Sequence, residues 1–386
     1  MAAPQAPKPL NLSVTKPGRV ALELSPVPAR WQTPTVPATA HGPPTPDRLR
    51  VAVLGVGSLG KEHARIYADL AAAGRVRFTG VFDPVSETAR RIAEKHRVRA
   101  FASTADAAAA SDALSVVTPT HTHHALAKAL LVQGRHLLVE KPMTTSAAQA
   151  TELVQLAQQH QCVLQVGHVE RFNPVFRYLE QIAAEPRFIE AHRLSQYTAR
   201  STDIGVVLDL MIHDLDVVLA FVKSPVTSVD AVGIPVLSAS EDIANARLRF
   251  ANGCVANLTA SRISPERMRK IRVFSGGATT SYVSLDYRAQ EGFIYRIARA
   301  DEPSSPLWKK LLAAKDATIV SEFAGKRIVR EPVPLAKEEP LRLELESFID
   351  CAQARRTPLV SGESAQRALD LALAITEQMR PSQGFQ

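Results

Sequence analysis

From Arg50 to Gly167 of this 386-residue chain, short apolar runs alternate with segments in which apolar residues recur at helical spacing. The apolar runs have the length and residue types of strands that are buried on both faces of a parallel sheet. They lie at 51–54, 77–82, 98–101, 114–117, 137–139 and 163–166, and the helical segments lie at 60–70, 83–96, 102–112, 121–132 and 146–160. This alternation predicts an α/β fold, with a doubly wound parallel sheet over residues 50–167.

After Gly167 the pattern becomes that of an antiparallel sheet with a few helices. Strands are predicted at 188–194, 226–234, 244–250, 254–263, 269–275, 280–287 and 291–298, and helices at 206–222, 338–355 and 363–380. Asn252-Gly253 is a hairpin signal between two of the strands. We therefore predict an α+β domain over 168–380 with a large, mostly antiparallel open sheet; its final helices could also pack back on the first domain. A bare, half-apolar sheet face usually packs against something, so we expect a homodimer or homotetramer through it.

Residues 1–49 have the composition of a disordered tail. Residues 1–50 hold 11 of the 26 prolines, and such a segment cannot bury enough apolar area to order itself. The tail lacks a basic stretch followed by an apolar one, so it is not a secretory signal. No apolar run is long enough for a membrane helix, and three cysteines without a Cys-x-x-Cys motif indicate a reducing compartment, the cytoplasm.

The net charge of +8 does not by itself indicate a nucleic-acid partner. Residues 1–50 carry six Lys or Arg and two Asp or Glu, a net +4, which leaves 8 − 4 = +4 for the other 336 residues. That remainder is spread without basic blocks, and aromatic residues make up only 5% of the chain. We therefore expect no nucleic acid; the modest positive balance suits an anionic small molecule, such as a dinucleotide or a sugar nucleotide.

Three glycines follow the first predicted strand in the pattern G-x-G-x-x-G. Gly55 allows a tight turn, Gly57 allows a pyrophosphate to approach the backbone, and Gly60 allows the helix to pack closely on the strand. The helix that starts here offers free N–H groups and a partial positive charge to phosphates. We predict that the turn from Gly55 through Ser58 and Leu59 to Gly60 binds a dinucleotide.

Asp83 ends the next predicted strand, 23 residues after Gly60. An acidic side chain at this place accepts hydrogen bonds from both ribose hydroxyls and repels a 2′-phosphate, so we expect NAD rather than NADP. The alternative is that the glycines only form a packing turn in an α/β protein without a cofactor.

Glu140 and Lys141 follow the apolar run 137–139, and Pro142 ends that strand because it has no N–H to donate. The carboxyl ends of the strands are where open α/β sheets bind ligands. A lysine held there can donate to a substrate oxygen or, if desolvated, help to remove a proton. The alternative is a solvated Lys–Glu pair.

Asp209 and His213 are four residues apart in a predicted helix, which places them on one face. A histidine beside a carboxylate is a candidate general base. The alternative is an ordinary surface pair, with Asp214 and Asp216 as solvated charges.

Three histidines, His121, His123 and His124, lie at the start of another predicted helix. We interpret them as a polar cap that faces a ligand. We expect no metal there, because no third type of ligand lies nearby.

Taken together, these motifs resemble the Gfo/Idh/MocA oxidoreductase family, over about residues 50–380. The resemblance rests on 51–60, on Thr118-Pro119 with His123, on Glu140-Lys141-Pro142 and on Asp209-x-x-x-His213. It implies an NAD-binding Rossmann domain followed by a domain with an open sheet. It also implies that Lys141 is the active-site lysine, that His213 is the acid/base residue with Asp209 beside it, and that Lys141 touches the nicotinamide ribose. The resemblance further assigns to the cofactor site the residues Thr118, Pro119, Thr120, His123 and Glu140.

Three stretches, 166–174, 188–195 and 207–216, are more closely similar to those family members that oxidise C3 of UDP-N-acetylglucosamine and supply a 3-keto sugar to an aminotransferase in lipid A synthesis. The proline-rich tail departs from that pattern. The resemblance implies an NAD-dependent sugar-nucleotide dehydrogenase. Alternatives are another sugar or polyol dehydrogenase, an NAD-dependent glycosidase, and a non-catalytic NAD sensor. Candidate substrate-binding residues, which could instead brace loops at the domain junction, are His168, Glu170, Arg171, Asn173 and Arg193.

Overall fold

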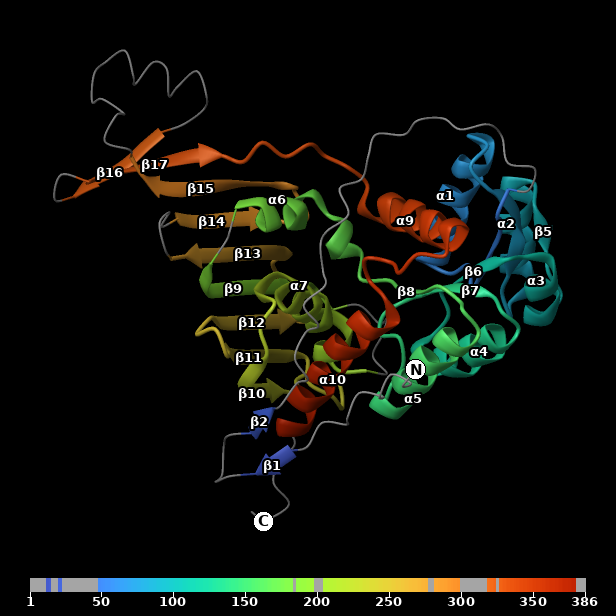
Figure 1. The fold of residues 1–386 in the computed structure, drawn as a ribbon, viewed down its shortest axis with the longest axis horizontal. Helices are drawn as coiled ribbons and strands as arrows, with labels where there is room; N and C mark the ends of the chain where they lie inside the picture. Colours follow the sequence, from blue (N-terminus) through green and yellow to red (C-terminus); the bar gives the residue numbers. More distant parts are fainter. Residues whose placement is uncertain are drawn as a thin grey trace, which may run out of the picture. The chain divides into compact units, whose positions relative to one another are not determined.

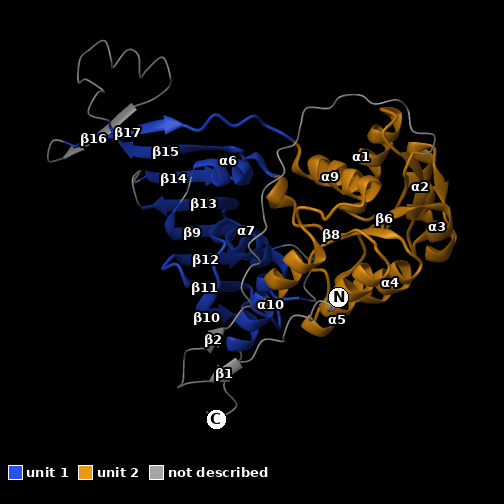
Figure 2. Ribbon diagram, viewed as in Figure 1, with its two compact units in different colours: residues 1–27, 173–338, 371–386 blue, residues 28–172, 339–370 orange. Residues whose placement is uncertain are grey.

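The computed structural model describes residues 12–14, 20–22, 48–182, 185–197, 204–276, 281–298, 318–323 and 326–379 (Figure 1). The chain forms two compact units (Figure 2). Unit 1 contains residues 1–27, 173–338 and 371–386, and unit 2 contains residues 28–172 and 339–370. The chain therefore returns to unit 2 after it has formed most of unit 1. The predicted domain limits of 1–49, 50–167 and 168–380 stay a prediction.

A six-stranded parallel sheet forms the centre of unit 2. Its strand order is β5-β4-β3-β6-β7-β8. The first strand of this sheet along the chain, β3, therefore lies in the middle, and the strand order reverses beside it. The strands are β3 (Arg50–Leu54), β4 (Arg77–Phe82), β5 (Arg99–Ala100), β6 (Ala113–Val116), β7 (His136–Val139) and β8 (Leu164–Val166). This sheet confirms the predicted doubly wound fold.

Helices cover both faces of this sheet (Figure 1). They are α1 (Gly60–Ala72), α2 (Ser86–His96), α3 (Thr104–Ala110), α4 (Thr120–Val132), α5 (Ala147–Gln159) and α9 (Pro340–Ala354), with a 3-10 turn, η1 (Val169–Phe172). Side chains of α1, α2 and α9 share one core with β3 and β4, in which Ile66, Tyr67 and Phe348 are fully buried. Helices α4 and α5 pack against each other on the opposite face. Apolar cover on both faces explains why the strands have near-continuous apolar sequences.

Helix α2 starts at Ser86, three residues later than predicted. The Asp83 carboxylate accepts hydrogen bonds from the backbone N–H groups of Val56 and Val85, both at 2.9 Å. These bonds hold Asp83 in the loop that follows β4, because they offer the backbone an alternative to the helix.

An eleven-stranded sheet forms the centre of unit 1, in the order β1-β2-β10-β11-β12-β9-β13-β14-β15-β17-β16. Strands β9 and β12 run parallel and all other neighbours run antiparallel, which confirms the predicted mostly antiparallel sheet. The strands are β9 (Pro186–Leu194), β10 (Val226–Ile234), β11 (Ile243–Phe250), β12 (Val255–Ser261), β13 (Met268–Ser275), β14 (Ser281–Asp286), β15 (Glu291–Ile297), β16 (Thr318–Phe323) and β17 (Lys326–Pro332). The sequence analysis did not predict β16 and β17; in β17, charged residues flank Ile328 and Val329 on both sides.

The predicted disordered tail lies outside the described residues except for its last two residues and two short strands, β1 (Leu12–Val14) and β2 (Val20–Leu22). Strand β2 pairs with β10 through Val20 and Val229. The sequence analysis did not predict these two strands.

One face of the unit 1 sheet carries helices α6 (Pro174–Ile182) and α7 (Ile212–Val222), together with the end of α10 (Gly362–Gln378) (Figure 1). A π-turn, η2 (Val207–Met211), leads into α7, so the helix predicted over 206–222 is right in position but wider in its first turn. The alternating burial of β9, with Ile189 and Ala191 buried and their neighbours half-exposed, shows that the other face is open.

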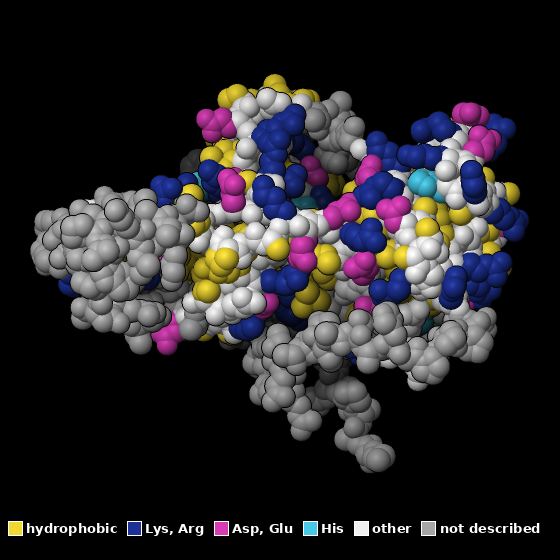
Figure 3. Space-filling view, turned by 90° about the horizontal axis from the view of Figure 1, so that it is seen from above, with side chains coloured by type: hydrophobic (Ala, Val, Ile, Leu, Met, Phe, Trp, Pro, Cys, Tyr) yellow, Lys and Arg dark blue, Asp and Glu magenta, His cyan; other side chains and the backbone are white. Residues whose placement is uncertain are grey.

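Charged side chains are mixed in sign on the surface drawn in Figure 3, where Lys and Arg stand among Asp and Glu. Neighbouring pairs such as Arg65–Glu62 and Arg90–Glu87, both at 2.9 Å, are largely exposed. Exposed pairs of this kind contribute little to stability.

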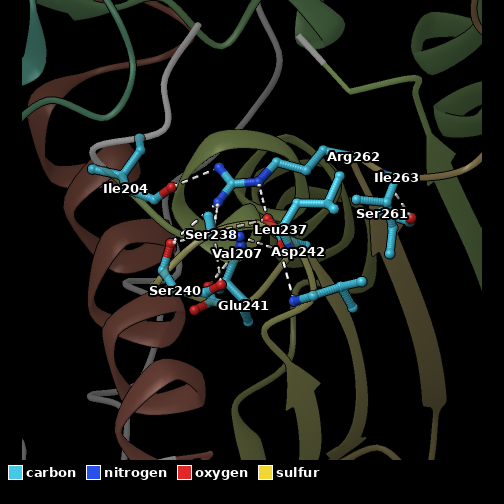
Figure 4. Close-up of polar contacts among 11 residues, drawn as sticks. Ile204, Val207, Leu237, Ser238, Ser240, Glu241, Asp242, Ser261, Arg262 and Ile263 are labelled. Carbon is cyan, nitrogen blue, oxygen red and sulfur yellow. Dashed lines mark hydrogen bonds and ion pairs between the residues drawn. The ribbon is translucent and has the colours of Figure 1, made fainter. Parts of the chain in front are cut away.

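A buried ion pair joins the β10–β11 loop to the end of β12 in unit 1 (Figure 4). Asp242 is fully buried, and one of its oxygens accepts from Arg262 Nε at 2.7 Å. The other oxygen accepts from three successive backbone N–H groups of the loop, those of residues 236–238. Although burial raises the pKa of Asp242, the loop N–H groups and the Arg262 guanidinium together lower it well below its usual range. Asp242 is therefore a carboxylate that shapes the loop.

We expect Asp242→Ala to lower the free energy of unfolding by about 3–5 kcal/mol, because the buried charge of Arg262 would lose the carboxylate that neutralises it. Urea unfolding followed by circular dichroism measures this loss. Glu190→Ala, which removes a half-exposed carboxylate 3.7 Å from Arg272 in the same unit, is the control and should cost about 1 kcal/mol or less. Equal losses in the two variants would contradict the structural role of Asp242.

Candidate active site

The glycine turn between β3 and α1 is shaped by two of its three glycines. Gly55 has a φ of +84°, and a Cβ there would lie 2.4 Å from the carbonyl oxygen of Val117. A Cβ on Gly60 would lie 1.9 Å from the carbonyl oxygen of Gly55. A Cβ on Gly57 would meet nothing within 4 Å, and the backbone there is exposed at the N-terminus of α1. Gly57 thus leaves open the space into which a phosphate can approach the helix N-terminus.

Asp83 lies at the carboxyl end of β4, in the loop after the strand that neighbours β3. Its two hydrogen bonds to backbone N–H groups use about half of the acceptor positions of a carboxylate. The remaining positions are available to hydroxyl groups. The open glycine turn and this carboxylate together fit the pyrophosphate and the adenosine ribose of a dinucleotide.

Glu140 is buried at the carboxyl end of β7, with 7% of its surface exposed. Its carboxylate lies 3.2 Å from His63 Nε2 in α1 and accepts from the backbone N–H of Lys141 at 3.2 Å. Although burial raises the pKa of Glu140, His63 and Lys141 outweigh it and lower the pKa below its usual value. A Cβ on Gly167 would lie 2.8 Å from this carboxylate, so the glycine makes room for it. The alternative of a solvated Lys–Glu pair therefore does not describe Glu140, whereas Lys141 itself is half-exposed.

His123 lies behind the loop that joins β6 to α4. Its ring is buried, with Nδ1 at 2.9 Å from the carbonyl oxygen of Pro142 and Nε2 at 2.7 Å from that of Thr118. Burial lowers the pKa of His123, and its backbone partners raise it less. Thr118, Pro119 and Thr120, which are predicted to line the nicotinamide side, are at least partly exposed in this loop.

The other two histidines of α4 do not join His123. His124 Nε2 lies 2.6 Å from Glu152 of α5, which also pairs with Lys128 at 2.7 Å, and His121 is exposed. The interpretation of all three histidines as one cap that faces a ligand is therefore wrong for His124. Within the described part of the chain, no group of three or more His, Cys, Asp or Glu side chains could hold a metal ion.

Asp209 and His213 lie in unit 1, where Asp209 belongs to the π-turn η2 and His213 to the first turn of α7. Both are half-exposed, whereas Met211 and Ile212 between them are fully buried. A π-turn inside a helix is frequently found at functional sites. Asp214 is buried and not solvated: it accepts two hydrogen bonds from Arg193, both at 2.9 Å.

The five predicted substrate-binding residues are all buried. Asn173 caps α6, since its side-chain oxygen accepts from the N–H of Val175 at 3.1 Å and its amide donates to the carbonyl oxygen of Tyr287 at 3.0 Å. Arg193 uses two of its nitrogens for Asp214. The exposed fractions of the other three are 1% for His168, 4% for Glu170 and 6% for Arg171. A role of these residues in binding substrate stays a prediction.

His63 is the site residue that the sequence analysis missed. It lies on the buried face of α1 together with Gly60, Ala64 and Tyr67, three residues after Gly60 and four before Tyr67. A polar residue in an otherwise apolar stripe is the signal that could have pointed to a buried partner.

Comparison with known proteins assigns both parts of the chain. Residues 49–168 match the family model described as an oxidoreductase family with an NAD-binding Rossmann fold, and residues 176–279 match the Gfo/Idh/MocA C-terminal domain. No helix within the described residues is long and apolar enough to cross a membrane.

Two relatives with named activities are a dehydrogenase of a sugar nucleotide and a dehydrogenase of a polyol. The chain is 36% identical over 328 residues to UDP-N-acetylglucosamine 3-dehydrogenase from Acidithiobacillus ferrooxidans, an alignment that covers 85% of this chain and 96% of the relative. A solved structure of that enzyme has a TM-score of 0.73 and covers 86% of this chain and 97% of its own. The NAD(+)-dependent scyllo-inositol 2-dehydrogenase of Bacillus subtilis is 23% identical over 355 residues, with 86% and 94% covered. GenD2 from gentamicin A biosynthesis, solved with NAD, is 19% identical, covers 89% of this chain and 97% of its own, and has a TM-score of 0.69, which shows a shared fold.

Two of the three glycines, Gly57 and Gly60, should respond differently to substitution by alanine. Gly57→Ala should keep the wild-type melting temperature but weaken NAD⁺ binding at least about tenfold, because its Cβ fills the space of the pyrophosphate. Gly60→Ala should lower stability by about 1–3 kcal/mol, because its Cβ meets the backbone of Gly55. Fluorescence titration and thermal unfolding measure the two effects. Gly134→Ala, in the turn between α4 and β7, is the control for binding; wild-type NAD⁺ affinity in Gly57→Ala would contradict the assignment.

Proposed function

The chain belongs to the Gfo/Idh/MocA family of NAD-binding oxidoreductases, and on this premise we propose that it oxidises a sugar-nucleotide hydroxyl, most specifically C3 of UDP-N-acetylglucosamine. The product is a 3-keto sugar nucleotide, which an aminotransferase of lipid A synthesis would consume. The reaction takes place in the cytoplasm.

One observation carries this proposal: the 36% identity to the 3-dehydrogenase extends over 96% of that enzyme, so it includes both the cofactor part and the substrate part. The site supports it locally. The open backbone at Gly57 and the carboxylate of Asp83 suit NAD⁺. Lys141 lies at the same carboxyl edge of the sheet, just after the end of β7. When bound, NAD⁺ supplies the hydride acceptor for the oxidation.

The chain's own residues handle the proton and the charge. His213 accepts the proton of the C3 hydroxyl, and Asp209 stabilises the charged ring. The ammonium of Lys141 stabilises the negative charge that develops on the substrate oxygen. His168, Glu170 and Arg171 hold polar groups of the sugar nucleotide, Arg171 through its planar set of donors.

The test is NADH absorbance after purified protein and NAD⁺ are mixed with UDP-N-acetylglucosamine. Absorbance should appear, and it should rise further when a glutamate-dependent aminotransferase removes the ketone. Lys141→Met and His213→Asn should each lower kcat by about 10²–10⁴-fold, as expected for loss of an acid/base or charge-stabilising group.

The outcomes separate the alternatives. Cleavage of a glycosidic bond without net NADH would indicate the glycosidase, and NADH with inositol but not with the sugar nucleotide would indicate a polyol dehydrogenase. Wild-type turnover in Lys141→Met and His213→Asn would sink the assignment of the two residues.

The proposed enzyme is a homo-oligomer that associates through the open face of the unit 1 sheet. Aromatic rings from four adjacent strands form a continuous row on this sheet: Phe188, Phe274, Tyr282 and Tyr295, with centroids 5.6, 4.5 and 5.0 Å apart. Phe274 is 38% exposed. Aromatic residues are enriched at protein–protein interfaces, because their rings bury much area at little cost in side-chain entropy.

Replacement of Phe274 by Asp should dissociate the oligomer, since it would place a charge at the centre of a buried apolar surface. Analytical ultracentrifugation should show the wild type as a dimer or tetramer and Phe274→Asp as a smaller species. The control is Val132→Asp, at an exposed residue at the end of α4 in unit 2, outside the unit 1 sheet. A wild-type protein that sediments as a monomer would contradict this part of the proposal.

A further inference from the structure

We propose that two buried histidines, His63 and His123, position Lys141 by holding the turn from Glu140 to Pro142 from two sides. This inference rests on the proposed function, because it assigns the two histidines as positioning residues for that reaction. All of the groups belong to unit 2.

The turn needs side chains to hold it, because the strand pairing ends where it begins. The last ladder bond runs from the N–H of Glu140 to the carbonyl oxygen of Val116, at 3.0 Å. Pro142 has no N–H, so it cannot continue the ladder. The backbone N–H of Lys141 donates within the turn, to the side chain of Glu140. What fixes Glu140 therefore also fixes Lys141.

His63 holds the first side of the turn. Its ring is fully buried, and Nε2 lies 3.2 Å from a Glu140 oxygen. Nδ1 has no hydrogen-bond partner among the described residues, so Glu140 is the ring's only such partner there. Because Glu140 is a buried carboxylate that can only accept, Nε2 must carry the proton. A buried charge is costly without a partner, which gives this bond its strength.

His123 holds the second side of the turn. Its Nδ1 faces the carbonyl oxygen of Pro142 at 2.9 Å, and its Nε2 faces that of Thr118 at 2.7 Å. Both oxygens can only accept, so a neutral ring, which has one N–H, donates to one of them and packs against the other. The ring thus joins the lysine turn to the loop after β6, whose Val117 carbonyl also packs against Gly55. The two histidines connect the lysine turn to both walls of the glycine turn: His63 through α1 and His123 through this loop.

This connection has a consequence for the reaction. A shift of about 1 Å in a group that must meet a reacting atom can cost about 10²-fold in rate. Without the two contacts, the turn that carries Lys141 would lose two of the side chains that hold it. We therefore expect loss of either contact to lower kcat much more than the affinity for NAD⁺.

His123 offers a matched pair of variants. The amide nitrogen of asparagine replaces Nδ1, so His123→Asn keeps a donor for Pro142; the amide nitrogen of glutamine replaces Nε2, so His123→Gln keeps a donor for Thr118. Both variants remove the ring. If the contact with Pro142 positions Lys141, kcat in His123→Gln should fall about 10²-fold below that in His123→Asn.

His63 is tested in the same way. His63→Gln keeps a donor at the place of Nε2 and should restore most of the kcat that His63→Leu loses. The control for the His123 variants is His124→Asn. His124 is the next residue of α4, and its partly exposed ring pairs with Glu152 of α5. This variant should leave kcat unchanged.

A second measurement does not depend on the substrate. The rate at which acetic anhydride modifies Lys141, read by mass spectrometry against the exposed Lys95, reports how the turn is held. It should change in His63→Leu and His123→Gln, and should match the wild type in His63→Gln and His123→Asn. If the wild type makes no NADH but the labelling pattern holds, the proposed function fails, whereas the proposal that the two histidines position Lys141 stands. Equal kcat and equal labelling in His123→Asn and His123→Gln, with wild-type melting temperatures, would overturn the proposal that the two histidines position Lys141.

Discussion

A single buried carboxylate, that of Glu140, constrains much of unit 2. Taking such a group out of water costs several kcal/mol unless donors surround it. Two donors meet this demand, the ring of His63 and the backbone N–H of Lys141, and Gly167, which has no side chain, leaves room for the carboxylate. They come from α1, from the end of β7 and from the end of β8. The carboxyl edge of the sheet is therefore fixed by a charge as well as by apolar packing.

The sequence was a good guide to the sheet of unit 2 because burial on both faces leaves a strong local pattern. Each strand is a short apolar run, and several of the turns contain glycine or proline, so the order of elements could be predicted along the chain. The glycine turn was predicted for the same reason: a φ of +84° at Gly55 and a backbone contact at Gly60 admit no other residue without strain. Strands β16 and β17 lack such a pattern and were not predicted.

The polar contacts could not be predicted, because their partners are far apart in the chain. His63 and Glu140 are separated by 77 residues, and Arg193 and Asp214 by 21. Periodicity shows that a residue lies on a buried stripe, but not which side chain it meets there. For this reason the alternative with Asp214 as a solvated charge stayed open, and His124 was expected to face a ligand, although each has its partner on another element.

The two buried carboxylates Asp242 and Glu140 show how similar physics can serve different ends. Asp242 pairs with an arginine, which keeps its charge at any ordinary pH, and with three N–H groups of one loop, so its surroundings do not change. Glu140 pairs with Nε2 of His63 in α1 and with the N–H of the lysine that follows it. The first arrangement suits a loop that must keep its shape. The second ties the turn that carries Lys141 to α1, so a contact between residues 77 positions apart in the chain helps to set the place of that lysine.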